Sequence, residues 1–142
     1  MTTHGQVYIE STGVYLYKHH DAYYLPEIVH DALREYDETR KLKWILDKRI
    51  AGETEILTGV ITKHIIQNSE CGNIEIGATQ STDIEWLITI TKNDQIKIEC
   101  GYMGFDTVLC MPLLEYIDLE IPPGDFFMNW EPKDGQLYKK QE

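Results

Sequence analysis

Two histidines and an aspartate, His19, His20 and Asp21, stand together where an alternating run of residues ends. Successive side chains of a strand point to opposite faces, so we expect His19 and Asp21 to share one face while His20 points the other way. Two imidazoles and a carboxylate can bind a divalent metal or transfer a proton. The alternative is a polar strand end in which Asp21 caps the next helix or turn.

A second polar group, Asp83 and Glu85, precedes Trp86 at the start of a later apolar run. Paired carboxylates can act as acid and base or hold a hard cation, but they are also typical of the solvent-facing side of a sheet. A catalytic site would require Asp83 to meet the histidines across neighbouring strands. The catalytic candidates are therefore His19, His20, Asp21 and Asp83.

Four tyrosines surround the first of these groups, two before it and two after it. Tyrosine offers a large contact area at low entropic cost and is enriched at protein interfaces. Half-buried tyrosines are also ordinary in strands. We predict a binding surface made of Tyr15, Tyr17, His19, Asp21, Tyr23, Tyr24, Glu85 and Trp86. No set of metal ligands is assigned, and no cofactor is predicted.

The elements that must position these residues can be read from local periodicity. Residues 7–10 and 14–19 alternate on either side of a Ser-Thr-Gly turn, which predicts a β-hairpin. Apolar residues then recur at helical spacing from residue 25, and a second helical period lies between residues 54 and 65. A basic stretch at residues 40–49 separates the two periods and is predicted to continue or restart a helix.

The second half of the chain is rich in predicted strands. Alternation returns at residues 74–77, 84–91 and 96–100, and the last two runs flank Asn93-Asp94, which predicts a second hairpin. We therefore predict an α+β fold with an antiparallel sheet of about five strands, in the order ββ-αα-βββ, and one or two helices on one face. Residues 1–142 form a single domain in this prediction, with a loose polar tail from about residue 131.

The charge balance bears on the choice of partner. The chain has 142 residues and a net charge of −11, of which residues 1–68 carry −2 and residues 69–142 carry −9. An acidic chain repels phosphate backbones, so direct nucleic-acid binding is disfavoured and a basic partner is favoured. The sequence also lacks the Walker loop, the dinucleotide fingerprint and the nucleophile elbow.

Cysteines and termini indicate the compartment. The three cysteines, Cys71, Cys100 and Cys110, are odd in number and widely spaced, which predicts free thiols. No apolar run is long enough to span a membrane, and the N-terminal residues lack the features of a signal peptide. We expect a cytoplasmic protein without a membrane partner.

The segment Val-Tyr-Leu-Tyr-Lys-His-His-Asp at residues 14–21 resembles the "YLYKHWDGYP" opening of small uncharacterised proteins from phages and mobile elements. Residues 82–87 and 95–98 resemble the "GDIEYLY"-like and "IKV"-like strands that follow in that family. Ala22 and Thr82 stand where the family commonly has glycine. The resemblance implies an accessory protein of a virus or mobile element, located in the host cytoplasm, and implies no activity.

Three hypotheses about function remain open, and binding is favoured over catalysis. The first is a binding or inhibitory module that docks on a host protein through the tyrosine-rich strand end and the acidic C-terminal half. The second is a small metal-assisted hydrolase of a nucleotide or phosphodiester, in which the group His19, His20 and Asp21 acts together with Asp83 and Glu85. The third is a sponge that sequesters a nucleotide through tyrosine stacking and the basic stretch. The exposed edges of the predicted hairpins also favour a homodimer.

Overall fold

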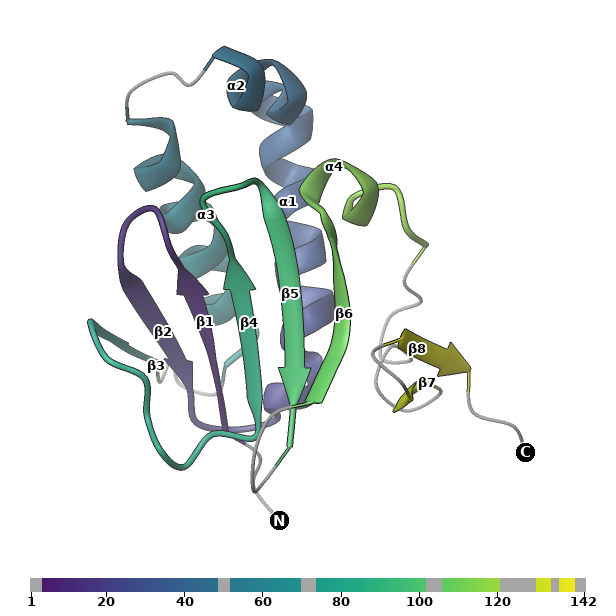
Figure 1. Ribbon diagram of the computed structural model, residues 1–142. Coiled ribbons are helices and arrows are strands. Elements are labelled where there is room, and N and C mark those ends of the chain that lie inside the picture. The colour runs from purple at the N-terminus through teal and green to yellow at the C-terminus, as the bar shows by residue number, and fades with distance from the viewer. Residues whose placement is uncertain are drawn as a thin grey trace.

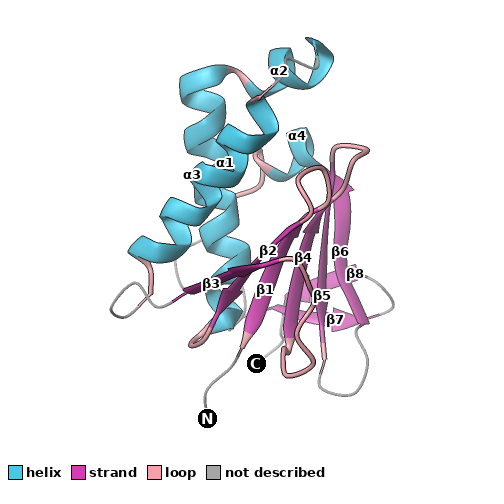
Figure 2. Ribbon diagram, turned by 90° about the vertical axis from the view of Figure 1, so that its left-hand side faces the viewer, coloured by secondary structure: helices cyan, strands magenta, loops and turns pink. Residues whose placement is uncertain are grey.

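The computed structural model describes residues 4–48, 52–69, 74–101, 106–120, 130–133 and 136–139. Most of the described chain forms two layers, a six-stranded sheet and a set of helices that cover one of its faces (Figures 1 and 2). The α+β class predicted from the sequence is therefore correct. No helix among these residues is both long and apolar enough to span a bilayer.

The chain begins with the predicted hairpin, which consists of β1 (Gly5–Ile9) and β2 (Val14–Lys18). The strands pair antiparallel from Gly5 opposite Lys18 to Ile9 opposite Val14. Gly13 closes the turn with a φ of 70°, a left-handed conformation that glycine adopts without a steric penalty. The prediction of this hairpin is confirmed.

Helices follow the hairpin. They are the 3-10 helix η1 (Ala22–Tyr24), α1 (Leu25–Arg40), α2 (Leu42–Lys48) and α3 (Glu53–Gln67). Pro26 stands in the first turn of α1, where the missing N–H costs no hydrogen bond. α1 and α3 pack on each other and on the sheet (Figure 2). One or two helices were predicted for this segment, and the structure has three after η1. The additional helix is α2, which the basic stretch forms.

The second half supplies the remaining strands. They are β3 (Ile74–Gly77), β4 (Trp86–Ile90), β5 (Gln95–Cys100) and β6 (Asp106–Pro112), followed by the short helix α4 (Leu113–Tyr116). The predicted hairpin of β4 and β5 is confirmed. A separate two-stranded sheet, β7 (Trp130–Lys133) with β8 (Gln136–Lys139), lies in the segment for which a loose tail is predicted.

The strand order is β3-β2-β1-β4-β5-β6, so the prediction of an antiparallel sheet of about five strands is correct only in part: the sheet has six strands and one of its pairings is parallel. β4 runs parallel to β1, with Gly5 opposite Trp86, while the other neighbours are antiparallel. β3 occupies the outer edge of β2, and the chain then crosses the sheet through residues 78–85 to reach the free edge of β1. The predicted order ββ-αα-βββ is also correct in part: β1 and β2, a helical segment, and β3 to β5 follow one another as expected, and β6, α4 and the β7-β8 pair come after them.

The two faces of the sheet have different chemistry. The face under the helices supplies β-branched and leucine side chains to the main core, which includes Val7, Ile9, Leu16, Ile88, Ile90, Ile96 and Ile98. The opposite face, which we call the open face, carries a smaller cluster in which Tyr17, Ile84 and Leu87 are buried and Tyr8 and Tyr15 pack against them. This open face carries most of the candidate site.

Candidate functional site

Strand registers place the side chains of the open face in rows. One row runs across the sheet through Glu75, Tyr17, Gln6, Leu87 and Glu99. The next row runs through Tyr15, Tyr8, Thr89, Lys97 and Cys110. The pairing of β3 with β2 puts Glu75 beside Tyr17, and the crossover that leads to β4, the parallel neighbour of β1, brings Asp83 to the same ring.

Two polar side chains of the first row, Gln6 and Tyr17, form hydrogen bonds with the crossover at residues 78–85. Gln6 is 4% exposed, and its amide donates to the carbonyl of Thr79 at 3.3 Å and accepts from the N–H of Ser81 at 2.9 Å. The Tyr17 hydroxyl donates to Oδ2 of Asp83 at 2.9 Å. Burial raises the pKa of Tyr17, and the hydrogen bond and charge of Asp83 raise it further. Tyr17 therefore stays protonated and acts as a donor.

Beside this crossover lies a hollow of about 420 Å³. Gln6, Tyr17 and Glu75 form its floor on the sheet, and Thr79 and Ser81 of the crossover form one wall. Its lining is mainly polar, so it suits a hydrogen-bonding group more than an apolar one.

The second row contains a pair of stacked aromatic rings. Tyr8 and Tyr15 stack with ring centroids 4.2 Å apart and an interplanar angle of 13°. Both side chains are half-buried. Burial raises the pKa of Tyr15, and the neighbouring Tyr8 adds to that effect. A stacked pair of half-buried tyrosine rings is a surface on which a cation or another flat group can pack.

Histidines and carboxylates gather where β1 and β2 meet the crossover. The rings of His4 and Tyr17 stack at 5.9 Å, and those of Tyr17 and His19 meet edge-on at 4.6 Å. His19 Nε2 lies 3.5 Å from a carboxylate oxygen of Glu75. Within the described part of the chain, Nδ1 of His4 and Oε2 of Glu85 are buried without a hydrogen-bond partner. A carboxylate beside an imidazole can position it for proton transfer or hold a cationic group.

The structure brings several predicted site residues together on the open face and separates others. Tyr15, Tyr17, His19, Asp83 and Glu85 all belong to the open face or the crossover. Trp86, by contrast, is 4% exposed and packs in the main core beneath the helices.

The residues after β2 turn toward the helix layer. Asp21 has a φ of 54° and stands at the start of η1 without capping it through its side chain. It lines a separate hollow of about 290 Å³ together with Tyr24, Glu27, Asp31 and Asn68. Tyr23 packs against the main core, and its ring lies 4.5 Å from that of Tyr24. His20 is exposed. The four predicted tyrosines therefore lie in two separate places, with Tyr15 and Tyr17 on the open face and Tyr23 and Tyr24 next to the helix layer.

The described residues offer little support for metal ligation or phosphate binding. Among the described residues, no three His, Cys, Asp or Glu side chains are arranged so that they could hold a metal ion. In the basic stretch, Arg40 forms a bidentate pair with Glu53 at 2.7 and 2.8 Å, and Lys43 pairs with Asp47 at 3.1 Å. Arg49, at the end of that stretch, lies outside the described residues.

Sequence reasoning overlooked three residues of the site: His4, Gln6 and Tyr8. Each lies on the open face of β1 or just before it, and each contacts a residue that was predicted. The sequence alone could have identified Tyr8, because alternation along β1 places its side chain on the face of the sheet that Val7 and Ile9 do not occupy. No such signal was available for Gln6, whose hydrogen-bond partners come from a segment about 75 residues away. His4 was missed because it precedes the predicted hairpin, although its ring contacts Tyr17.

The resemblance to phage and mobile-element proteins rests on residues that the structure divides between two environments. The tyrosines of the opening lie on the open face, while Asp21 turns toward the helices. No match to this chain was found among family models, curated proteins or solved structures.

Proposed function

We propose that this chain is a protein-binding module whose open face receives a basic segment of a partner protein. The observation that carries the proposal is the stacked, half-buried pair of Tyr8 and Tyr15, at 4.2 Å, on a sheet face that none of the described helices covers. Arginine and lysine side chains pack favourably over tyrosine rings, by about 0.5–2 kcal/mol for each contact.

Charge supports a basic rather than an acidic partner. Glu75 and Glu99 end the neighbouring row, and Asp83 and Glu85 lie on the crossover. The two rows of the open face contain one lysine, Lys97. Its ammonium group is 3.8 Å from a carboxylate oxygen of Glu99, which offsets its positive charge. With a net charge of −11 the whole molecule attracts basic partners and repels acidic ones.

The resemblance of residues 14–21 adds a context to this proposal. An accessory protein of a phage or mobile element would act by docking on a host protein, and an exposed basic segment of that protein is a complementary target. Inhibition would follow if the host protein also uses that segment to bind its own acidic ligand.

A titration with short basic peptides tests the proposal. Fluorescein-labelled Gly/Ser peptides that carry three arginines are added to the protein and followed by fluorescence anisotropy, with otherwise identical peptides that carry three glutamates. We expect the arginine peptides alone to bind, with an affinity that falls as salt rises. The substitution Tyr15→Ala should weaken binding about tenfold.

The matched control is Trp44→Ala, which removes an aromatic ring that is 53% exposed on α2, away from the open face. It should leave the affinity unchanged. Equal binding of the glutamate peptides, or undiminished binding by the Tyr15→Ala variant, would show that the open face is not the docking surface.

A further inference from the structure

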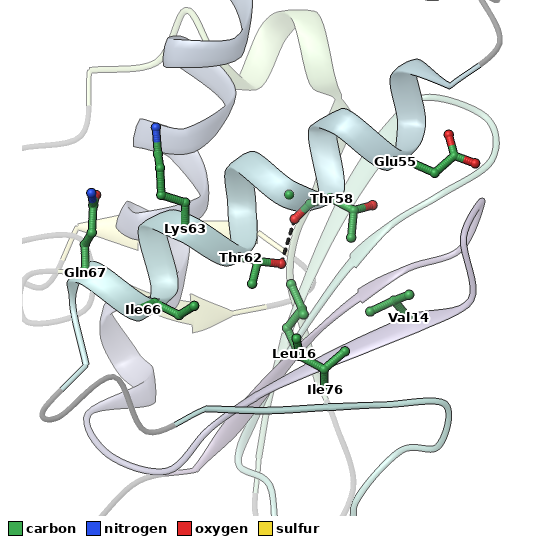
Figure 3. A pocket seen from close by; sticks show the side chains of 10 residues that line it. Val14, Leu16, Glu55, Thr58, Thr62, Lys63, Ile66, Gln67 and Ile76 are labelled. Atoms are coloured by element: carbon green, nitrogen blue, oxygen red, sulfur yellow. Dashed lines mark hydrogen bonds between the residues drawn. The ribbon is translucent and has the colours of Figure 1, made fainter.

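An apolar groove lies on the other side of the sheet, between α3 and the strands β2 and β3 (Figure 3). It encloses about 660 Å³. Val14 and Leu16 form its floor, Ile76 forms the outer rim, and α3 forms the wall. α3 buries Leu57, Ile61 and Ile65 on one face, and its small residues Thr58, Gly59 and Thr62 are among those that line the groove.

The hydroxyl groups in the wall of the groove already have hydrogen-bond partners within α3. The hydroxyl of Thr58 donates to the carbonyl of Thr54 at 2.8 Å, and that of Thr62 donates to the carbonyl of Thr58 at 2.7 Å. Between them, Gly59 has no side chain, and a Cβ placed there would meet nothing within 4 Å. Ile66, 41% exposed, completes the apolar surface. An apolar side chain could therefore enter without leaving a buried polar group unsatisfied.

The outer rim of the groove is the edge of the sheet. β3 is the terminal strand, and no described strand pairs with its outer side, so its outward backbone N–H and C=O groups are free to bond another chain. Edge strands are commonly protected by lysine, proline or a bulge, and β3, with the sequence Ile-Glu-Ile-Gly, has none of these. Ile76 is instead 63% exposed.

The two faces of β3 dictate what an added strand would look like. Ile76 lies on the groove side, and Glu75 lies on the open face. A strand beside β3 must alternate in the same way, with every second side chain in the groove and the others near Glu75. We propose that the edge of β3 and this groove form a second binding site, which takes an extended partner segment with alternating apolar and basic residues.

Charge favours such a partner over a second copy of this chain. Two β3 edges that pair with each other would bring Glu75 of one copy close to Glu75 of the other, and like charges on neighbouring strands destabilise the pair. A further carboxylate, Glu55, is exposed at the end of the groove, while Lys63 is held by Glu35 at 2.6 Å. This site lies apart from the tyrosine pair and goes beyond the proposed function.

Two synthetic heptapeptides test the site. The first is acetylated and amidated Thr-Val-Lys-Val-Lys-Val-Thr, and the second replaces both lysines with glutamate. Binding is measured by calorimetry, and hydrogen exchange is followed at the backbone amides of residues 74–77. We expect the lysine peptide to bind at least about tenfold more tightly than the glutamate peptide and to slow exchange at the outward amides of β3.

Two substitutions should remove this binding without disturbing the core. Ile76→Lys places a charge on the exposed rim, and Gly59→Leu fills the groove from the wall. Each should weaken the lysine peptide about tenfold or more. Trp44→Lys is the matched control, because it places the same charge on another exposed apolar residue, which lies on α2, and it should have no effect.

The outcomes separate this site from the open face. Tyr15→Ala should weaken the lysine heptapeptide much less than the groove variants do, and Gly59→Leu should leave binding of the arginine peptides unchanged. The proposal is wrong if no heptapeptide binds, if both bind equally, or if the groove variants retain full affinity. It is also wrong if the protein without peptide is a dimer in sedimentation and Ile76→Lys makes it a monomer, because a second copy would then be the occupant.

Discussion

The hydroxyl of Tyr17 donates a hydrogen bond of 2.9 Å to Oδ2 of Asp83, and these two residues lie 66 positions apart in the sequence. This contact joins β2 to the crossover that leads from β3 to β4. Together with Gln6, it holds the crossover against the open face. The shape of the candidate site thus depends on a bond between the two halves of the chain.

Removing that bond should loosen the crossover. The substitution Tyr17→Phe keeps the buried ring and deletes the hydroxyl, so we expect a loss of about 1–2 kcal/mol in the free energy of unfolding. Hydrogen exchange at residues 78–85 should become faster. Tyr15→Phe is the matched control, because no hydrogen bond to its hydroxyl is found within the described residues, and it should change neither quantity. Unchanged exchange in the Tyr17→Phe variant would contradict the role given to this bond.

Gly5 lies where β1 is in close contact with η1 and the start of α1. A Cβ at this position would lie 2.8 Å from atoms of both Ala22 and Leu25 and 3.1 Å from Trp86. We expect Gly5→Ala to lower the free energy of unfolding by about 1–3 kcal/mol, because the core must shift to admit the methyl group. Denaturant titration measures this loss, and a stability equal to that of the unmodified protein would contradict it.

Gly59 provides the opposite case within a helix. Space is open around it, and alanine has the higher helix propensity. Gly59→Ala should therefore raise the free energy of unfolding by about 0.5–1 kcal/mol. The same denaturant titration serves for both glycines. A loss of stability at Gly59 would mean that the groove wall is more crowded than the structure shows.

Glu53 should make stability depend on pH in the acid range. Hydrogen bonds from Arg40, and then from the Tyr36 hydroxyl at 2.7 Å, lower the pKa of Glu53 from 4.5 to about 2. The folded state therefore prefers the carboxylate more strongly than the unfolded state does. This stabilisation is complete above pH 4.5 and is lost as the pH falls toward 2. Melting temperatures measured across this range should fall accordingly.

The variant Glu53→Gln isolates this contribution. It should melt at a lower temperature than the unmodified protein at neutral pH and should lose less stability on acidification. If the two proteins show the same decline between pH 4.5 and 2, other carboxylates account for the acid sensitivity.

Cys100 and Cys110 should differ in reactivity. Burial raises the pKa of Cys100 to about 11, and the charges of Glu85 and Asp106 add to the effect. Cys110 is exposed. Because the thiolate is the reactive form, iodoacetamide at pH 8 should modify Cys110 faster than Cys100, by about tenfold or more. Peptide mass spectrometry measures both rates, and denaturant should abolish the difference. Comparable rates in the folded protein would show that Cys100 is accessible.

Local pattern was enough to predict most of the helices and strands of this fold. Alternation identified both hairpins, and the helical spacing of Leu25, Ile28, Val29 and Leu33 identified α1. α3 formed despite Gly59 and several β-branched residues, because burial of Leu57, Ile61 and Ile65 outweighs weak intrinsic propensity. Alternation with Ile88 and Ile90 also indicated the core position of Trp86, which we nevertheless included in the predicted binding surface.

Pairing between distant segments could not be predicted in this way. Nothing in the alternation of β1 or β4 shows that these two strands are neighbours or that they run parallel. The contacts of Gln6 and Tyr17 with the crossover follow from that pairing, and so does the placement of Asp83 beside Tyr17. The candidate site was therefore predicted residue by residue but not as an arrangement.

The parallel pairing of β1 with β4 also bears on the order in which the chain can fold. β1 is complete within the first ten residues, yet its partner on one side begins at Trp86, roughly eighty residues later. During synthesis, the apolar side chains of β1 are therefore only partly covered by the hairpin and helices until β4 has been made. We expect the N-terminal half to stay incompletely packed until β4 has left the ribosome, and the closing of this long loop to set the rate at which the sheet forms.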